Sequence, residues 1–566
     1  MTRFRFEPSR IGPPLAVLLL AGPVLFGLAG TLLPSFGYLP ALGGSNPTIA
    51  PFRELLAQPA ILRSAAMSLT TGLASALVSL AVVALFLAAW SGTRTFARLQ
   101  HMVSPLLAVP HAAAAFGLAF LIAPSGMVAR LISPELTGWT RPPDLLIVHD
   151  PLGLALVAGL VVKEVPFLLL VSLAALGQVP AARARMLAAS LGYGRVAGFL
   201  LLVWPALYRR IRLAVFAVIA FAASVVDVAA ILGPTTPPTL AVRIVGWMND
   251  PDLSMRFLAS AGAVAQLCVT VVALALWVLL ERAGSAAARL VAARGLRLRR
   301  DGAFRRVALV AMALSAATVF AGIGALGLWS VAGLWQFPDT APASLSLRTW
   351  RQAAPAIAGP LATTLVVALG ATAAALAVTL LCLSREDRSG RRPSRAAEGL
   401  IYLPLIVPQV AFLFGFQFFF LVAGWRPGLA TLAFAHIVFV LPYLFLSLSG
   451  PWRAYDRRYE AVAAGLGRSR LATLWRVKLP MLAAPVATAA AVGFAVSVGL
   501  YLPTLLIGAG RLTTVTTEAV ALASGGNRRL VGAYAFLQML LPAAGFLIAT
   551  LVPALLFRAR RAMRVG

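Results

Sequence analysis

The residue types that carry metal or redox chemistry are few in this sequence and widely spaced. Four histidines and two cysteines occur in 566 residues. The histidines form neither an HExxH pattern nor an i, i+4 pair, so the sequence offers no zinc-binding helix. Cys268 and Cys382 lie in or beside apolar runs, which excludes a disulfide framework and a cysteine-based metal site. We therefore expect no bound metal, and the redox compartment stays undetermined.

Nucleotide hydrolysis has no support in the sequence either. A phosphate-binding P-loop places a lysine directly after a glycine. The two lysines of the chain, Lys163 and Lys478, both follow valine. We expect this chain to bind no cofactor and to hydrolyse no ATP itself.

Ionisable side chains inside long apolar stretches are candidates for solute contact, because each costs about 2.5 to 3.5 kcal/mol at mid-bilayer on insertion scales. Asp227 stands alone in FAASVVDVAAILG, and a single acid in an apolar pathway suits a cationic solute. A hydrogen bond to a neighbouring helix, or a place near the outer interface, explains Asp227 equally well. Lys163 and Glu164 are adjacent and point about 100° apart on a helix, so we expect each to have another partner.

The composition of the whole chain is that of a membrane protein. It is 60% hydrophobic and 12% charged, with a mean hydropathy of +0.89, whereas soluble domains are about 25% charged. The net charge of +30 would point to nucleic acid in a soluble chain. Here the basic residues form short clusters between apolar stretches, which is the pattern of cytoplasmic loops in membrane proteins.

About twelve stretches are apolar enough to cross a bilayer core, which needs about 20 residues per helix. They cover approximately residues 11–31, 66–90, 102–122, 151–177, 212–232, 255–281, 306–334, 360–383, 399–424, 428–450, 484–508 and 533–557. With both termini cytoplasmic, the cytoplasmic segments hold 35 cations against about 12 on the other face, as the positive-inside rule requires. The first stretch exceeds a signal-peptide core and lacks a clear A-x-A site, so we interpret it as an uncleaved anchor.

The chain contains an internal repeat. AVPHAAAAFG (108–117) aligns with IVPQVAFLFG (406–415), and VVKEVPFLLL (161–170) aligns with IVFVLPYLFL (437–446). The offset falls from 298 to 276, which predicts an insertion in the outer loop 123–150.

Six spans return a chain to its starting side, so the two halves are parallel repeats. Residues 1–283 form the first half and residues 306–566 the second. The basic segment 284–305 is the cytoplasmic linker, and we interpret its arginines as an orientation signal in contact with lipid headgroups.

Two parallel halves would enclose a central pathway, with helices interrupted by proline as places for a binding site or gate. His111 and Gln409 follow the repeated Pro110 and Pro408, which makes them a matched polar pair. We take these four residues and Asp227, whose equivalent in the second half we expect to be Leu500, as candidates for the substrate pathway. Tolerated kinks and helix packing are the alternative explanation for them.

A polar segment between the fourth and fifth span of each half is also repeated. RMLAASLGYGRVAGFLLLVWP (185–205) aligns with EAVAAGLGRSRLATLWRVKLP (460–480) at an offset of 275. Each copy predicts a small-residue helix, a glycine that ends it in the left-handed conformation, and a second amphipathic stretch before a proline. Such a projection suits a groove on a separate cytoplasmic protein. A surface elbow without a partner is the alternative.

These segments resemble the EAA motif of the inner-membrane permeases of binding-protein-dependent ABC importers. That motif runs E-A-A, then Gly, then Leu-Pro thirteen residues after the Gly, and Gly467, Leu479 and Pro480 match it. Glu460 stands one residue before the usual acid. The first copy departs further, with Arg185 in place of the acid and a tryptophan before Pro205. The resemblance extends over both halves and is closest to fused permeases of the thiamine and ferric-iron type.

The resemblance implies an all-α inner-membrane permease of two parallel six-helix repeats that moves a small cationic solute, such as thiamine, or a metal. Its implied partners are a cytoplasmic ABC ATPase in two copies, which uses ATP, and an external solute-binding protein. Nucleotide-driven closure of the ATPase pair would rock the halves between inward-open and outward-open states. The residues implied to contact the ATPase are Arg185, Ala188, Ala189, Gly192 and Pro205 in the first segment and Glu460, Ala461, Ala464, Gly467, Ser469, Leu479 and Pro480 in the second. The departures in the first segment imply weaker coupling there.

Two other classes of protein are alternatives to an ABC permease. An ion- or proton-coupled secondary transporter is also built from six plus six helices, but it needs a relay of acids or histidines and no docking segments. Asp227 and Glu164 alone make a poor relay. A membrane-embedded enzyme would need a clustered nucleophile, a metal ligand set or a phosphate loop, and the sequence has none of these.

Overall fold

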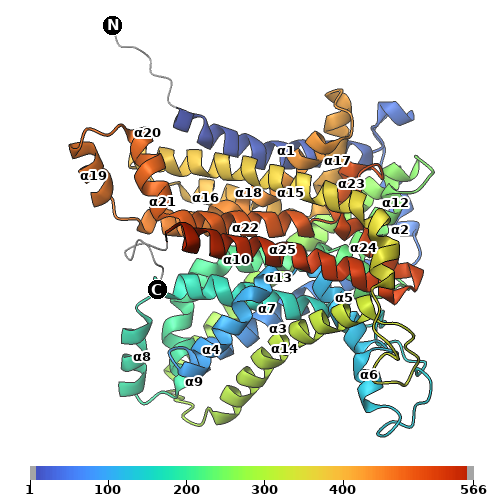
Figure 1. Ribbon diagram of the computed structural model, residues 1–566, viewed down its shortest axis with the longest axis horizontal. Helices are drawn as coiled ribbons and strands as arrows, with labels where there is room; N and C mark the ends of the chain where they lie inside the picture. The colour runs from blue at the N-terminus through green and yellow to red at the C-terminus, as the bar shows by residue number, and fades with distance from the viewer. Residues whose placement is uncertain (1–7, 558–566) are drawn as a thin grey trace.

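The computed structural model describes residues 8–557, and this part of the chain is built from helices. Two isolated β-bridges, Leu39–Gly44 and Ala332–Leu345, are the only β-pairing within it. The long helices lie side by side in one bundle, and short helices cover its two ends (Figure 1). The all-α fold predicted from the apolar stretches is confirmed.

Within residues 8–557, each half contributes six main helices in the same order. In the first half they are α1 (Gly12–Ser35), α3 (Ile61–Trp90), α5 (His111–Ile122), α7 (Leu154–Leu176), α10 (Trp204–Ser224) and α13 (Met255–Ala293). In the second half they are α14 (Gly302–Val331), α15 (Arg348–Ser389), α17 (Gln409–Val422), α18 (Leu429–Ala454), α22 (Ala483–Gly499) and α25 (Arg528–Leu556). The order supports a duplicated six-helix unit.

Shorter helices connect the main ones. In the first half they are α2 (Ala50–Ala57), α4 (Arg94–Val103), α6 (Met127–Ile132), α8 (Ala181–Ser190), α9 (Arg195–Gly198), α11 (Asp227–Leu232) and α12 (Leu240–Met248). In the second half they are α16 (Arg395–Ile406), α19 (Arg458–Gly465), α20 (Arg470–Thr473), α21 (Leu479–Met481), α23 (Leu502–Gly508) and α24 (Val515–Leu522).

By length and composition, the described residues contain nine helices able to cross a membrane, or up to eleven spans if each of two bent pairs counts as one. The prediction of about twelve spans exceeds this upper count by one. The predicted span that does not meet these criteria is 212–232, which corresponds to α10 and α11. α10 contains Arg209, Arg210 and Arg212, and it ends at Ser224 before α11 begins. α10 nevertheless packs inside the bundle against α3, α7 and α13.

The first main helix of each half packs against the other half. α1 lies along α17, where a Cβ on Gly415 would be 2.0 Å from the carbonyl oxygen of Gly27. α14 lies along α5, where a Cβ on Gly322 would be 2.9 Å from the Cα of Gly117. Gly117 and Gly415 are equivalent in the repeat, so the repeated glycine marks two symmetric helix crossings. Small residues permit this close backbone approach, and the two halves interlock.

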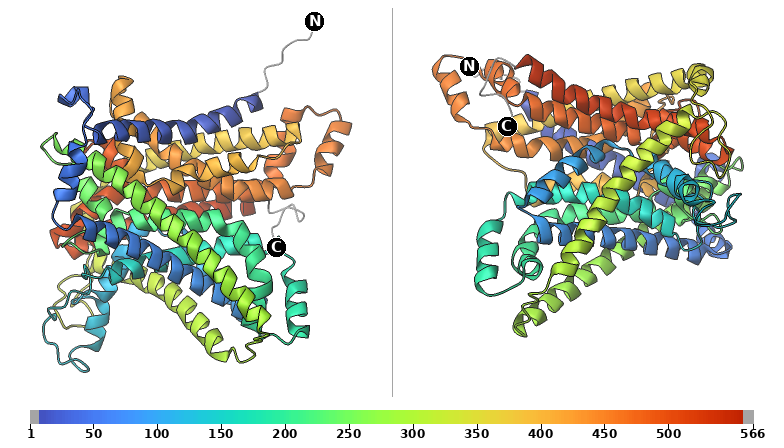
Figure 2. Two further views of the ribbon diagram at one scale, coloured as in Figure 1. Left: turned by 180° about the vertical axis from the view of Figure 1, so that it is seen from behind. Right: turned by 60° about the horizontal axis from the view of Figure 1, so that its bottom comes forward.

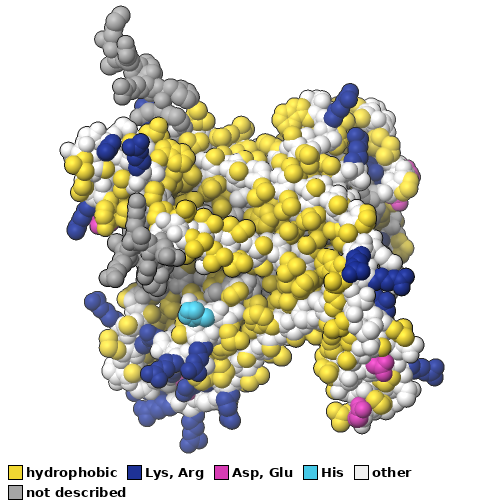
Figure 3. Space-filling model, viewed as in Figure 1, with side chains coloured by type: hydrophobic (Ala, Val, Ile, Leu, Met, Phe, Trp, Pro, Cys, Tyr) yellow, Lys and Arg dark blue, Asp and Glu magenta, His cyan; other side chains and the backbone are white. Residues whose placement is uncertain are grey.

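The two ends of the bundle differ. α8, α19 and α20 project at one end, and α6 lies at the opposite end with the predicted insertion (Figure 1). Views from behind and from below show the same separation (Figure 2). α1 begins and α25 ends on the side of α8 and α19, whereas the chain termini themselves, residues 1–7 and 558–566, lie outside the described part. Hydrophobic side chains cover the middle of the bundle, and Lys and Arg side chains gather around α8 and α9 (Figure 3).

Candidate functional site

Two projecting segments form the first part of the candidate site. We call residues 181–205 loop 1 and residues 456–480 loop 2. Each consists of a short helix (α8 or α19), a glycine turn, a second short helix (α9 or α20) and a π-helical turn that leads into the next helix. α9 and α20 are related by the offset of 275 residues, as are the π-helical turns 199–203 and 474–478. The predicted repeat therefore extends to the local structure of the loops.

Gly192 and Gly467 end the first helix of each loop in the left-handed conformation, with φ of +78° and +69°. In loop 2 the amide of Gly467 donates to the carbonyl of Ala464 at 2.9 Å, and the next amide donates to the carbonyl of Ala463 at 3.0 Å. Loop 1 contains both bonds at the equivalent residues, each 3.0 Å long. This pair of bonds is the Schellman closure of a helix, which favours glycine at the positive φ. The turn geometry predicted for both glycines is confirmed.

Each loop presents two large apolar side chains one helical turn apart on its outer surface. Leu187 and Leu191 are 54% and 45% exposed in loop 1, and Val462 and Leu466 are 63% and 75% exposed in loop 2. The two pairs are equivalent at the offset of 275. These four residues are not among the candidates predicted from the sequence. Their i, i+4 spacing in a segment too polar to cross the membrane was the available signal.

Most of the other residues predicted to contact a partner are also exposed or half-buried. Ala189, Pro205, Ala461, Ala464, Gly467 and Ser469 are exposed, Gly192, Leu479 and Pro480 are half-buried, and Ala188 is buried. The two charged candidates, Arg185 and Glu460, do not simply point outward. Both hold their loop to the bundle.

Loop 2 is tied to α15 by a charged network around Lys478. The Lys478 Nζ donates to Oδ2 of Asp387 at 2.5 Å and to Oε1 of Glu460 at 2.9 Å. The ammonium lies 4.4 Å from the ring centroid of Trp452, and Arg457 pairs with Asp387 at 3.1 Å. The Lys478 side chain is 4% exposed. A buried cation shared by two carboxylates fixes the loop in one geometry relative to α15.

Loop 1 is tied to α3 by two arginines. Arg185 donates to the carbonyl oxygen and to the Oγ of Ser91 at 3.1 Å each, and Arg195 donates to the same carbonyl at 2.5 Å. Burial, followed by the positive charges of Arg185 and Arg305, lowers the pKa of Arg195. Ser91 directly follows α3. Arg185 thus fastens loop 1 to the second main helix of its half, as Lys478 fastens loop 2.

The linker between the halves lies against loop 1. The predicted linker 284–305 is only partly non-helical, because α13 extends through residue 293 and α14 begins at residue 302. In its irregular part, residues 294–301, the carbonyl of Arg297 accepts a hydrogen bond of 2.9 Å from the amide of Gly194. Arg299 donates from Nε to the carbonyl of Gly192 at 3.1 Å. The linker therefore contacts loop 1, a protein contact that the sequence did not predict.

The two loops cap their second helix differently. In loop 2 the Oγ of Ser469 accepts from the amide of Ala472 at 3.2 Å. The equivalent residue in loop 1 is Gly194, which has no side chain. Asp301 of the linker replaces the cap, since its Oδ2 accepts from the amide of Val196 at 3.0 Å. Loop 1 depends on the linker for an N-cap that loop 2 makes for itself.

The second part of the candidate site is a polar cluster between the halves. The Nε2 of His111 lies 3.3 Å from Oε1 of Glu164, and Asp227 is close enough to His111 for direct electrostatic interaction. From the second half, Tyr443 lies in electrostatic range of Glu164, and Tyr501 in range of Asp227. The side chain of His111 is 33% exposed, whereas that of Glu164 is 4% exposed. The side chains of Glu164 and Asp227 are thus buried, whereas His111, Tyr443 and Tyr501 are partly exposed.

The matched residues of the pathway occupy equivalent places. Pro110 and Pro408 are the N-cap residues of α5 and α17, and His111 and Gln409 are their first residues. A Cβ on Gly499 would be 3.4 Å from the Cβ of Pro110, so Pro110 faces the second half. Within the described residues no hydrogen bond joins Gln409 to the polar cluster. Only the histidine of the matched pair belongs to it.

The buried charges of the first half lie partly as the sequence predicts. Lys163 donates to the carbonyl of Leu106 at 3.1 Å and Glu164 meets a different partner, as predicted. Asp227, in contrast, does not lie within a continuous helix but begins α11 after a break. The second half has the same break between α22 and α23. The residue equivalent to Asp227 in the repeat is therefore Leu502 and not the expected Leu500.

Metal chemistry has no candidate ligands in the described residues. No group of three or more His, Cys, Asp and Glu side chains in residues 8–557 is arranged to hold an ion.

Known proteins resemble the chain over nearly its whole length. Residues 386–561 match the family described as binding-protein-dependent transport system inner membrane component. The inner membrane ABC transporter permease protein YnjC of Escherichia coli is 30% identical over 534 residues, which is 93% of this chain and 96% of that protein. The molybdenum transport system permease ModB of Mycobacterium tuberculosis is 36% identical over 136 residues, 22% of this chain and 52% of its own length. The spermidine/putrescine permease PotC of Haemophilus influenzae is 27% identical over 90 residues, which is 16% of this chain and 35% of that protein.

Proposed function

Because the chain belongs to the inner-membrane permeases of binding-protein-dependent ABC transporters, we propose that it carries both halves of an importer's solute pathway. In this proposal two copies of a separate cytoplasmic ATPase bind loops 1 and 2. An external solute-binding protein delivers the solute at the opposite end of the bundle. ATP is bound and hydrolysed by the partner, and this chain supplies no nucleotide site.

The observation that carries the proposal is the pair of exposed apolar side chains on each loop. Leu187 with Leu191 and Val462 with Leu466 occupy equivalent positions on two projections from the same end of the bundle. Exposed apolar surface on a polar projection favours a protein partner. Two equivalent projections suit a partner with two equivalent grooves, which is what an ATPase dimer offers.

The loops are also built to transmit force. Lys478 joins loop 2 to α15, and Arg185 joins loop 1 to α3. A displacement of either loop therefore moves a main helix of its own half. In the proposal, closure of the ATPase pair pushes both loops and shifts the interlocked halves between two packed arrangements.

The proposal places the end with the loops in the cytoplasm. The cytoplasmic segments of that arrangement hold 35 of the 48 cations in the sequence, in accord with the positive-inside rule. The start of α1 and the end of α25 lie at this same end (Figure 1), which supports cytoplasmic termini.

We further propose that the solute is a small cation, with thiamine as the first compound to test. The support is the pair of carboxylates in the cluster between the halves: Asp227 and Glu164 both interact with His111, and Glu164 also interacts with Lys163. The aromatic rings of Tyr443 and Tyr501 lie in the same region and suit an organic cation. A metal complex of positive charge is the second candidate class.

Crosslinking tests the coupling. A chain with Cys268 and Cys382 replaced by alanine and with Arg468→Cys in loop 2 is expressed in its native membranes and treated with a bifunctional maleimide. We expect capture of a polypeptide that 8-azido-ATP labels. The matched control is Leu136→Cys, because Leu136 is 81% exposed but lies in the loop at the other end. Capture of the labelled polypeptide by both variants, or by neither, would contradict the proposal.

Uptake of radiolabelled thiamine tests the solute class. We expect Asp227→Asn to lower uptake while ATP hydrolysis by the complex continues. Uptake that follows a proton gradient without ATP would instead assign His111, Glu164 and Asp227 to a proton relay of a secondary transporter. Unchanged uptake in the Asp227→Asn variant would remove this acid from the pathway.

A further inference from the structure

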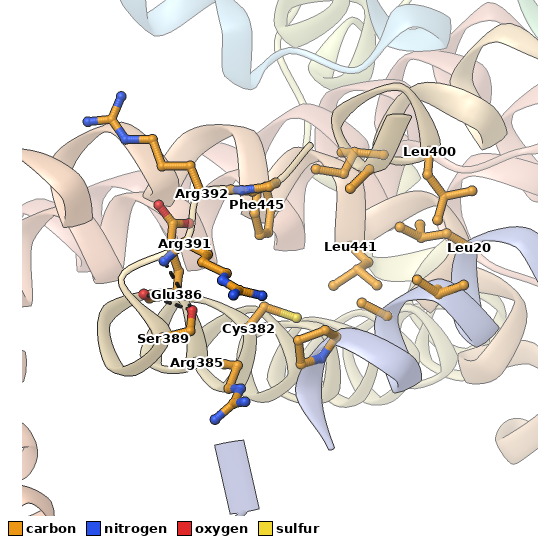
Figure 4. Close-up of a pocket in the computed structure, with 16 residues that line it drawn as sticks. Leu20, Cys382, Arg385, Glu386, Ser389, Arg391, Arg392, Leu400, Leu441 and Phe445 are labelled. Carbon is orange, nitrogen blue, oxygen red and sulfur yellow. Dashed lines mark hydrogen bonds between the residues drawn. The ribbon is translucent and has the colours of Figure 1, made fainter. Parts of the chain in front are cut away.

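A cavity of about 220 Å³ lies between α1, α15, α16 and α18, near the end of the bundle that carries loop 2. Its two ends differ in chemistry. Arg385, Glu386, Arg391 and Arg392 lie at one end, where the side chains of Arg385 and Arg392 extend outward, and Leu20, Leu400 and Leu441 lie at the other (Figure 4). The cavity is thus polar toward the loop end and apolar toward the middle of the bundle.

The apolar part is open toward the position of the lipid. Val17 lines the cavity and is 48% exposed on α1, and Leu18 beside it is 66% exposed. α1 is one of the helices long and apolar enough to span the membrane. An occupant that enters from this side is therefore a lipid chain, since hydrocarbon surrounds an exposed apolar face of such a helix.

The polar part is basic. Glu386 is the acidic side chain that lines the cavity, and its two oxygens accept hydrogen bonds from Arg453 at 2.7 and 2.9 Å. Arg391 and Arg392 are exposed, and within residues 8–557 no carboxylate forms an ion pair with either guanidinium. Guanidinium groups match the geometry of a phosphate. The charge of this end favours an anion over a zwitterion.

We propose that this cavity binds an anionic phospholipid, with the phosphate at Arg391 and Arg392 and one acyl chain along Leu20, Leu400 and Leu441. Basic pockets between membrane helices on the cytoplasmic side recognise such headgroups. The proposal rests on the proposed function only in naming the cytoplasmic leaflet. A free phosphate would use the basic end alone, and a neutral lipid would use the apolar end alone.

The site is next to the connection between loop 2 and the bundle. Glu386 lines the cavity, and the following residue, Asp387, holds Lys478 and Arg457. A lipid bound here therefore lies against the base of loop 2. We expect anionic lipid to stabilise the loop geometry that a partner meets.

Native mass spectrometry of the purified full-length chain tests the proposal. The chain is titrated with phosphatidylglycerol and with phosphatidylcholine of the same acyl chains. We expect one phosphatidylglycerol to bind about tenfold more tightly than phosphatidylcholine, and the double variant Arg391→Gln and Arg392→Gln to lose about tenfold in that affinity. The matched control removes the same charge outside the cavity, by Arg282→Gln and Arg294→Gln, and should keep the wild-type affinity.

A second variant tests the apolar part without a change of charge. Ala16 lines the cavity, so Ala16→Trp should fill it and abolish tight phosphatidylglycerol binding. Equal binding of the two lipids, or equal losses in the two double variants, would overturn the proposal. Competition by inorganic phosphate together with full binding by Ala16→Trp would assign the basic end to a free anion instead. These measurements use the chain without ATPase or solute, so their outcome is independent of the crosslinking and uptake tests.

Discussion

The ammonium group of Lys478 lies 2.9 Å from the carboxylate of Glu460, across the width of loop 2. This contact closes the loop into one unit, and the second bond of the same ammonium, to Asp387, fastens that unit to α15. α15 has 42 residues, which corresponds to about 63 Å of helix. Loop 2 is therefore attached to a helix that crosses the whole bundle.

Replacement of Lys478 by glutamine should destabilise the protein by about 2 kcal/mol, because it leaves Asp387 and Glu460 without their shared cation. The change in unfolding free energy can be measured by denaturant titration in detergent. Arg476→Gln is the matched control, since Arg476 is exposed in the same turn and its loss should cost less than about 0.5 kcal/mol. Equal losses in the two variants would contradict the role assigned to Lys478.

Gly467→Ala should cost about 1 kcal/mol through backbone strain alone. No atom lies within 4 Å of a Cβ added at Gly467, but its φ is +69°, which L-residues adopt at a cost. Gly465→Ala is the matched control, because it also meets no atom within 4 Å and lies in helical conformation, where alanine is favoured. Denaturant titration should show opposite signs for the two variants. Stabilisation by Gly467→Ala would refute the left-handed turn.

Gly415→Ala should destabilise the contact between α1 and α17 by about 3 kcal/mol, because the new Cβ would lie 2.0 Å from the carbonyl oxygen of Gly27. Gly370→Ala is the control in α15, where a Cβ meets no atom within 4 Å. Limited proteolysis and thermal unfolding in detergent should separate the two variants. A fully stable Gly415→Ala protein would mean that α1 does not pack at this distance.

Asp301→Ala should expose the amide of Val196 in loop 1, because the linker carboxylate is its acceptor. Loss of one hydrogen bond of about 1 kcal/mol corresponds to roughly fivefold faster exchange. Hydrogen exchange of peptides from loop 1 measures this change. Peptides around Ala472 in loop 2 serve as the internal control, since Ser469 caps that helix. Unchanged exchange at Val196 would show that the linker does not cap loop 1.

Local features of the fold were predictable from the sequence. The alignment at an offset of 275 predicted the turns at Gly192 and Gly467, because the conformation of a short loop depends on its own glycine and on its length. The repeated Pro110 and Pro408 likewise predicted interruptions within spans 102–122 and 399–424, and α5 and α17 begin directly after these prolines. These signals depend on a few neighbouring residues and are present in both halves of the repeat.

Contacts between distant segments were not predictable. Lys478 and Asp387 are 91 residues apart, and no pattern in either segment identifies the other. α1 and α14 are apolar on every side, so the sequence gives no sign of which half they join. The break before Asp227 falls inside a continuous apolar run. For this reason the fifth span was predicted as one helix, and Leu500 was predicted as the equivalent of Asp227.

The central claim is that a separate ATPase binds the apolar pairs of the two loops. The most direct measurement is ATP hydrolysis that co-purifies with this chain from its native membranes, for the wild type and for the double variant Val462→Asp and Leu466→Asp. The account predicts hydrolysis with the wild type, a loss of at least about tenfold with the double variant, and no loss with Leu136→Asp at the opposite end. Absence of hydrolysis with the wild type, or its full retention by a correctly inserted double variant, would contradict the account.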